Sequence, residues 1–201
     1  MKEQKELDFI VIGAAKSATT TLYELIKSHP QIFIPAAKEV PFFSDSKTYK
    51  KGVASYIKSY FSGANPEKLW GTVTPQYMLG QGDTNPEIVA GRIHKSLSDV
   101  KLIALLRDPA ERAFSHYKMQ LQRGYAKLSF EELVEQTLEN PDKLRANTKP
   151  EDSFIFGSEY GRILGYYYSL FPRKNILLLT TEELRKSPED VVREICTFIG
   201  I

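Results

Sequence analysis

One lysine and a run of small and hydroxyl-bearing residues follow the first apolar segment of the chain. The apolar residues 9–12 lead into Gly13-Ala-Ala-Lys-Ser-Ala-Thr-Thr-Thr21, after which a helical pattern begins. Small residues let backbone N–H groups approach an anion closely, and a helix N-terminus adds unpaired N–H donors and the positive end of the helix dipole. The threonine hydroxyls and the Lys16 ammonium would complete a site for a phosphate-like group. The stretch therefore predicts nucleotide binding; a solvated turn with a surface lysine is the alternative interpretation.

A second anion-binding pattern begins at Arg107, where another apolar run ends. Pro109 follows at a favoured first position of a helix, and Ser115 falls about two turns into that helix. A guanidinium can bind phosphate through two parallel hydrogen bonds, and the serine hydroxyl can donate a further one. Alternatively, Arg107 pairs with Asp108 or Glu111 and binds no ligand.

Apolar runs alternate with helical patterns, and this alternation predicts the scaffold that positions both sites. Four runs have the composition of buried strands: 9–12, 69–73, 100–106 and 175–179. Helical patterns lie at about 20–28, 53–61, 86–98, 110–122, 129–138, 158–171 and 188–199. The order predicts an α/β fold with a central, mostly parallel sheet between two layers of helices. Ligands of such sheets bind beyond the carboxyl ends of the strands, where the segments around Lys16, Thr74 and Arg107 fall.

Composition limits the classes of function. The 201 residues fit one domain, and 42% hydrophobic and 26% charged residues are ordinary for a globular protein. A net charge of +2 gives no support for binding nucleic acid or a membrane surface. No apolar run is long enough for a signal peptide or a membrane span, so we expect a cytoplasmic protein. With Cys196 alone and three histidines, we expect neither an intrachain disulfide nor a metal site. The polar segment 139–156 predicts a surface loop, either a plain connection or a lid.

The residues around Lys16 match neither the phosphate loop of nucleotide triphosphatases nor the Gly-x-Gly-x-x-Gly dinucleotide motif. Together, the motifs resemble those of sulfotransferases that use 3′-phosphoadenosine 5′-phosphosulfate (PAPS). The matching segments cover nearly the whole chain and are Gly13 to Leu22, Lys38 to Phe43, Arg107 to Tyr117, and Gly157 to Leu184. The chain looks most similar to the carbohydrate sulfotransferases and their bacterial relatives. This resemblance implies a single-domain, P-loop-type three-layer fold that moves a sulfuryl group from PAPS to a hydroxyl. A carbohydrate is the favoured acceptor; a small alcohol, a lipid or a carrier-tethered acyl chain stays open.

The resemblance also implies roles for individual residues. The 5′-phosphosulfate would be held by Ala15, Lys16, Ser17, Ala18, Thr19, Thr20 and Thr21. The 3′-phosphate would be held by Arg107 and Ser115, and Tyr160 would help to close the nucleotide pocket. In the transfer step Lys16 would stabilise the leaving phosphate and Glu39 would take the hydroxyl proton. The other interpretation of Glu39 is a loop carboxylate paired with Lys38. His116 is an alternative base or a packing residue.

Three departures from the family pattern, and two rival functions, follow from the same comparison of motifs. Ala18 replaces a glycine that is common in the loop, and Val73 stands where carbohydrate-modifying relatives often carry lysine. Relatives usually continue beyond Ile201 with a basic loop, so we expect 1–201 to lack the C-terminal part of the family domain.

The rival functions are those of a P-loop kinase acting on a nucleotide or small molecule and of a non-catalytic nucleotide-binding protein. Five aromatic residues would line an acceptor cleft or belong to the core: Phe42, Phe43, Tyr49, Tyr56 and Tyr60. Trp70 would pack near adenine or in the core.

Overall fold

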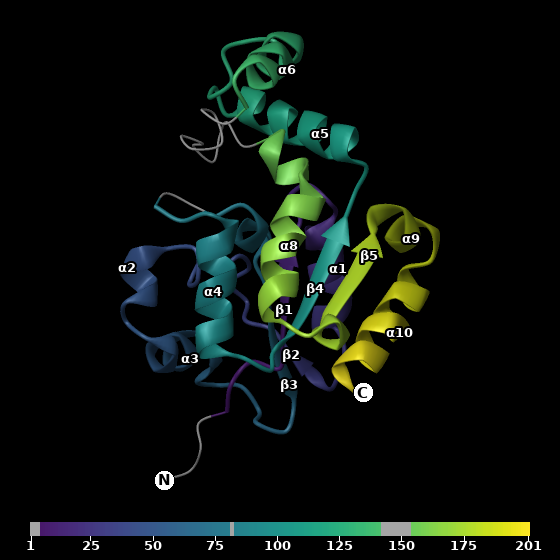
Figure 1. The fold of residues 1–201 in the computed structure, drawn as a ribbon. Helices are drawn as coiled ribbons and strands as arrows, with labels where there is room; N and C mark the ends of the chain where they lie inside the picture. Colours follow the sequence, from purple (N-terminus) through teal and green to yellow (C-terminus); the bar gives the residue numbers. More distant parts are fainter. Residues whose placement is uncertain (1–4, 81–82, 142–153) are drawn as a thin grey trace.

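Five parallel strands form the centre of the computed structural model, which describes residues 5–80, 83–141 and 154–201. The strand order is β2-β3-β1-β4-β5 (Figure 1). The strands are β1 (Phe9–Gly13), β2 (Ile32–Phe33), β3 (Leu69–Val73), β4 (Lys101–Leu106) and β5 (Ile176–Thr180). Val11 of β1 lies opposite Val73 and Ile103, so the ends of β3, β1 and β4 are adjacent. The predicted parallel sheet is confirmed, and β2, a two-residue edge strand, was not predicted.

Helices connect the strands and cover both faces of the sheet. They are α1 (Thr19–Lys27), α2 (Ser46–Tyr49), α3 (Val53–Phe61), α4 (Pro86–Ser96), α5 (Pro109–Gln122), α6 (Phe130–Glu139), α8 (Tyr160–Leu170), α9 (Thr181–Lys186) and α10 (Pro188–Ile199). Short 3₁₀ turns span Pro75–Met78, Phe156–Ser158 and Arg173–Asn175. The seven predicted helices are present to within about two residues at each end, whereas α2 and α9 were not predicted.

Alternate residues of each strand enter opposite halves of the core. Ile10 and Ile12 of β1 pack in the half that contains α3, α4 and α8. Phe9 and Val11 pack in the half that contains α1, α9 and α10. Side chains on a strand alternate between its two faces, so a strand covered on both sides is apolar throughout, as the run in β1 is. The outcome is the predicted three-layer α/β domain.

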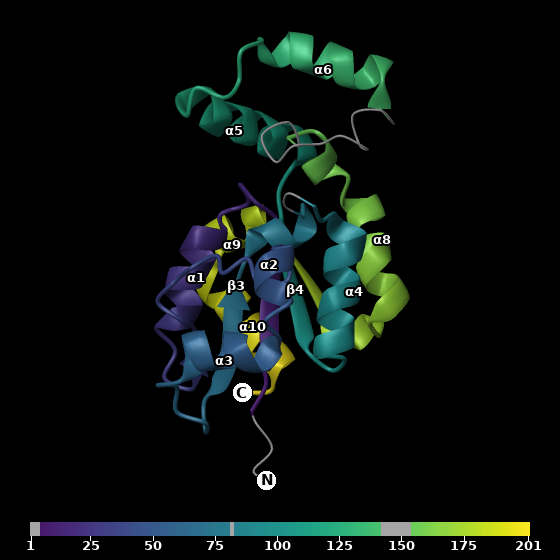
Figure 2. The ribbon, with the colours of Figure 1, turned by 90° about the vertical axis from the view of Figure 1, so that its left-hand side faces the viewer.

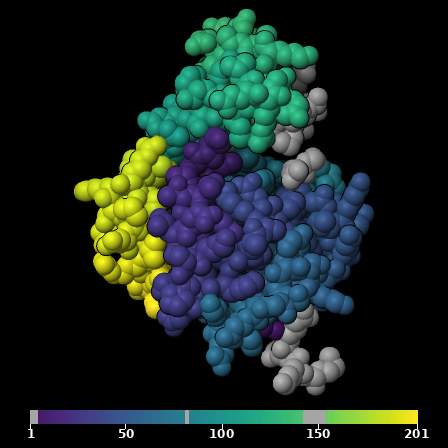
Figure 3. All heavy atoms as spheres, turned by 180° about the vertical axis from the view of Figure 1, so that it is seen from behind, coloured from purple at the N-terminus to yellow at the C-terminus, as the bar shows by residue number. Residues whose placement is uncertain are grey.

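The carboxyl ends of the strands meet at one end of the molecule, beneath α5 and α6. The arrowheads of β4 and β5 point toward α5 in Figure 1, and Figure 2 shows α5 and α6 projecting above the body of the domain. In Figure 3 purple N-terminal residues meet the teal and green of these helices at the same end. At the tip of β1, Gly13 allows a close approach, because a Cβ atom there would come within 2.2 Å of Met78 Sδ. Within the described residues, the helices include none long and apolar enough to cross a membrane.

Candidate functional site

The loop between β1 and α1 keeps the N-terminus of the helix available to a ligand. Its backbone is anchored by the Ala14 N–H, which donates to the Leu105 carbonyl at 2.8 Å. Lys16 and Ala18 both have left-handed backbones, with φ of 73° and 59°. The first turn of α1 carries no side-chain cap and no acidic residue, whereas α4, α5 and α6 each begin with a capping side chain. The N–H donors and the helix dipole of α1 thus remain free to bind an anion.

Lys16 is partly buried, and the acceptor beside its ammonium among the residues that the structure describes is a weak one. Its ammonium lies 3.6 Å from the sulfur of Met119. Burial lowers the pKa of Lys16, the charges of Arg123 and Arg107 lower it further, and the charge of Glu39 acts in the opposite direction. Burial is the largest cause of the lowered pKa of Lys16, and the charge contributions that follow it show an excess of positive charge around the loop. That excess favours binding of an anion next to α1.

Glu39 is the carboxylate that faces this positive region. Its backbone is left-handed, with φ of 64°, and its N–H donates to the Val73 carbonyl at 3.1 Å, which ties it to the end of β3. Lys38 donates to Oε1 at 2.6 Å and Gln76 donates to Oε2 at 2.8 Å. Burial acts to raise the pKa of Glu39, but these two hydrogen bonds and the charges of Lys38 and Arg123 outweigh it, so the pKa is lowered. Glu39 is therefore ionised at neutral pH and can accept a proton.

Lys38 joins this carboxylate to the helix N-terminus. Besides its bond to Glu39, its ammonium donates to the Thr20 hydroxyl at 2.8 Å. The pairing of Glu39 with Lys38, one of two interpretations from the sequence, is thus present. It does not remove Glu39 from the site, because the same lysine holds the carboxylate next to the predicted anion-binding residues.

Arg107 lies directly beside the Lys16 loop, as the positions of the two strands predict. Its Nη1 donates to the Lys16 carbonyl at 3.4 Å. Its Nε and Nη2 donate to one oxygen of Glu111 at 3.0 and 2.8 Å, so the alternative ion pair is also present. Asp108 instead caps α5 by accepting from the Glu111 N–H. The Tyr160 hydroxyl donates to the Arg107 carbonyl at 3.0 Å and so anchors the end of β4.

The remaining predicted ligands lie in the β1–α1 loop, on the first turn of α1 and on α5. Ser17 is fully buried, and its hydroxyl lies beside that of Tyr160. Ser115 is partly exposed on α5. Thr19 is buried, whereas Thr20 and Thr21 are exposed on the first turn of α1. The β1–α1 loop and helices α1 and α5 thus supply all the predicted nucleotide-binding residues except Arg107 and Tyr160, which follow β4 and begin α8.

Arg112 supports this site from beneath and was missed in the sequence. It is 0% exposed, and burial lowers the pKa of its guanidinium to about 10. It donates to the Ala15 carbonyl at 3.3 Å, to the Ser158 hydroxyl at 2.6 Å and to the Phe154 carbonyl. Within the described part of the chain, these three acceptors are neutral oxygens. A fixed positive charge therefore lies directly under the anion-binding loop. Arg112 lies three residues after Pro109, which begins the helix, and nothing in that sequence position predicts that its side chain is buried.

His116 is a packing residue in this structure. Its side chain is buried, and its Nε2 lies 3.3 Å from the amide nitrogen of Gln120. Burial and then the charges of Arg112, Lys16 and Arg123 lower its pKa to about 4. The imidazole is therefore neutral at neutral pH. Its burial makes it a poorer candidate than Glu39 for contact with an acceptor.

Of the aromatic residues considered for an acceptor cleft, Phe42, Phe43 and Tyr56 are buried in the core and Tyr49 packs against it, whereas Tyr60 is exposed. Phe42 stacks on Tyr56 at 4.7 Å, and Phe43 contacts Tyr77 edge-on at 5.5 Å. Trp70 lies near the start of β3 and stacks on Phe61 at 5.3 Å. Lys16 follows β1 and Glu39 is tied to Val73 at the other end of β3, so the position of Trp70 favours the core role, the second of its two interpretations.

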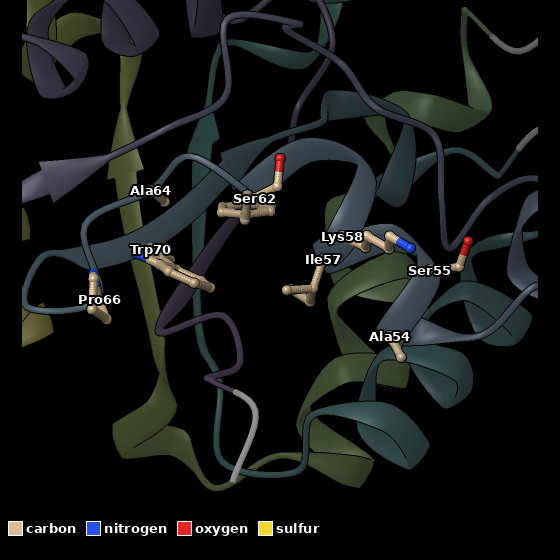
Figure 4. A pocket seen from close by; sticks show the side chains of 9 residues that line it. Ala54, Ser55, Ile57, Lys58, Ser62, Ala64, Pro66 and Trp70 are labelled. Carbon is tan, nitrogen blue, oxygen red and sulfur yellow. The ribbon is translucent and has the colours of Figure 1, made fainter. Parts of the chain in front are cut away.

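A separate apolar hollow of about 660 Å³ lies beside Trp70 (Figure 4). The residues that line it come from α3, the following loop and β3: Ala54, Ser55, Ile57, Lys58, Phe61, Ser62, Ala64, Pro66 and Trp70. It shares no residue with the Lys16 site.

Of the predicted loop 139–156, residues 142–153 lie outside the described residues, so the choice between a lid and a connection stays a prediction. Among the residues that are described, no three His, Cys, Asp or Glu side chains gather as metal ligands would.

Comparison with known proteins assigns this arrangement to one family. A model described as "Sulfotransferase domain" matches residues 6–201. Among curated proteins, the chain is 28% identical over 207 residues to a Drosophila melanogaster bifunctional heparan sulfate N-deacetylase/N-sulfotransferase, covering 96% of the chain and 19% of that protein. It is 26% identical to a mouse heparan sulfate glucosamine 3-O-sulfotransferase 5, covering 96% of the chain and 53% of that protein. The chain thus spans about half or less of the length of these relatives.

Solved structures agree with that assignment. A sulfotransferase from Alicyclobacillus acidocaldarius superposes with a TM-score of 0.81 at 26% identity, covering 98% of this chain and 82% of the other. The mouse sulfotransferase SULT7A1, solved in complex with PAP, has a TM-score of 0.62 at 18% identity, covering 99% of this chain and 61% of the other. The second similarity shows the shared fold alone.

Proposed function

Because the chain belongs to the sulfotransferase domain family, we propose that it moves the sulfuryl group of PAPS to a hydroxyl acceptor. One observation carries this proposal: Lys38 bridges the N-terminus of α1 and Glu39, so an anion site and a base lie side by side. Sulfuryl transfer needs those two elements next to each other, because the acceptor hydroxyl must lose a proton as it attacks an anionic donor.

The donor carries anions at two separated places, and the site offers two groups of cationic and N–H donors. The uncapped first turn of α1 and Lys16 fit the 5′-phosphosulfate, since both present donors without strong acceptors of their own. Arg107, with Ser115 on the adjacent helix, fits the 3′-phosphate. Arg107 would exchange its pairing with Glu111 for the phosphate, because a dianion offers it a stronger bidentate partner. Tyr160 would act through Arg107, whose carbonyl it holds.

In the transfer, the bond between sulfur and the phosphate oxygen breaks while a bond from the acceptor oxygen to sulfur forms. Glu39 takes the acceptor proton, and Lys16 stabilises the charge that grows on the phosphate oxygen. Such a base contributes about 10²–10⁴-fold to the rate, and one well-placed donor about 10²–10³-fold. Glu39 is ionised at neutral pH, as the base must be, although the hydrogen bonds that lower its pKa also weaken it as a base.

A carbohydrate is the acceptor that the relatives favour. The named activities of two of them concern heparan sulfate, a polysaccharide. A small alcohol, a lipid and a carrier-tethered acyl chain belong in the same screen. The cationic groups Arg123 and Lys118, whose charges act on Lys16, favour an acceptor with a negative charge.

The test is a screen of hydroxyl acceptors with radiolabelled PAPS, together with PAP binding measured by calorimetry. We expect transfer by the wild-type protein, and a loss of about 10²–10⁴-fold in Glu39→Gln. PAP affinity should stay within about threefold, since Glu39 is not assigned to the nucleotide. Glu67→Gln, an exposed loop carboxylate, is the matched control. No PAP binding by the wild type, or binding without transfer to any acceptor, contradicts the proposal. Full activity in Glu39→Gln removes that residue from the mechanism.

A further inference from the structure

Lys38 lies between two groups that have separate tasks in the proposed reaction. Its ammonium is 2.8 Å from the Thr20 hydroxyl and 2.6 Å from Glu39 Oε1. An ammonium has three N–H donors, so two are used by these contacts and one is left for another acceptor. The side chain is 20% exposed, which leaves the ammonium within reach of a ligand bound at the first turn of α1.

The same contacts occupy the carboxylate that must act as a base. Lys38 donates to one oxygen of Glu39, and Gln76 donates to the other. A carboxylate in an ion pair resists protonation, because the incoming proton removes the charge that binds the ammonium. Lys16 and Arg123 add positive charge from the β1–α1 loop and from the end of α5. Glu39 is therefore a weaker base while Lys38 remains on it.

An anion at the first turn of α1 competes directly for that ammonium. Thr20, which Lys38 already contacts, is one of the residues assigned to the phosphosulfate. A sulfuryl oxygen bound there is a charged acceptor, and charged acceptors form hydrogen bonds about twice as strong as neutral ones such as a hydroxyl. With one contact already on Thr20, the ammonium needs only to exchange its contact with Glu39.

We propose that Lys38 is a further catalytic residue, which transfers its contact from Glu39 to the bound sulfuryl group and thereby frees Glu39 to take the acceptor proton. This inference rests on the proposed function. Sulfur leaves the phosphate oxygen, which keeps the bonding electron pair, and binds the acceptor oxygen. The acceptor proton passes to Glu39 as this occurs. Lys38 stays protonated throughout and stabilises the negative charge on the moving group.

The test compares Lys38→Met and Lys38→Arg with the wild type, and uses Lys58→Met, an exposed lysine on α3, as the control. We expect Lys38→Met to lose about 10²–10³-fold in kcat at every pH, and Lys38→Arg to recover part of it. PAP affinity should change by less than about threefold, because PAP lacks the sulfuryl group. In the donor-free protein, a carbon-13 NMR titration should show that the Glu39 pKa rises in Lys38→Met.

The pH profile separates catalysis from mere positioning of the base. If Lys38 leaves Glu39 when the donor binds, the acid limb of kcat/KM at saturating PAPS stays in place in Lys38→Met while the plateau falls. If Lys38 only holds Glu39, the acid limb of kcat/KM in Lys38→Met moves to higher pH, and kcat/KM on the plateau above it equals the wild-type value. That result overturns the inference. An inactive wild type instead overturns the proposed function, and this inference with it. An unchanged Glu39 pKa in donor-free Lys38→Met also contradicts the inference.

Discussion

The buried imidazole of His116 should make the fold sensitive to mild acid. Its pKa is about 4 in the folded protein against an ordinary 6.5, so below pH 6.5 the unfolded chain takes up a proton that the folded chain does not. Stability is present above the unfolded pKa and is lost as the pH falls toward the folded pKa. A tenfold change in proton affinity corresponds to about 1.4 kcal/mol, so the loss from pH 7 to pH 5 is about 2 kcal/mol. Urea unfolding at both pH values measures it.

The variant His116→Asn isolates this effect from the titration of carboxylates. Asparagine has no titrating group and can still hydrogen-bond Gln120. Its free energy of unfolding should fall between pH 7 and pH 5 by about 2 kcal/mol less than that of the wild type. The same substitution at His29, on a partly exposed turn, controls for the loss of an imidazole. Equal pH dependence in the wild type and His116→Asn would refute the reasoning, because the burial and nearby cations would then have no energetic effect on the ring.

Two further predictions concern the loop and its neighbour Arg107. Ala18→Gly should raise the free energy of unfolding by about 1 kcal/mol, because φ of 59° is unfavourable for a residue with a Cβ atom. Ala37→Gly, at an exposed position without a left-handed backbone, should lower it by about 0.5–1 kcal/mol; thermal or urea unfolding of both variants tests the contrast. Glu111→Gln should tighten PAP binding several-fold by removing the competing partner of Arg107, and Arg107→Gln should weaken it. Calorimetry in low salt measures both, and an unchanged affinity in the two variants removes Arg107 from the nucleotide site.

The central strands were predictable because burial on both faces leaves a simple sequence pattern. Strands β1, β4 and β5 are near-continuous apolar runs, and a helix follows each of them. The edge strand β2 has two residues, too few to show any period. Helix α9 has six residues and follows β5 directly. The sequence indicates this helix through the capping box of Thr180 and Glu183. Six residues are too few to show an apolar periodicity as well.

The candidate site was predictable where strand ends determine it. Lys16 and Arg107 follow neighbouring parallel strands, so their proximity comes from strand order. The contact of Lys38 with Thr20 comes instead from the path of an irregular loop, which no periodicity describes. The burial of Arg112 likewise depends on tertiary contacts that sequence periodicity does not predict. An arginine on a helix usually lies in solvent, and it is buried here because residues 154–158 pack against α5 and supply its acceptors.

The balance of charge around the loop explains why this site should bind a dianion rather than a neutral ligand. Glu39 and Glu111 are each already paired, with Lys38 and Arg107. Neither compensates the buried guanidinium of Arg112, whose hydrogen-bond acceptors among the described residues are carbonyl and hydroxyl oxygens. Burying a charge in this way costs free energy that neutral acceptors offset only in part. An anion on the loop above Arg112 would restore some of that free energy, so ligand binding and stability of the fold are coupled at this point.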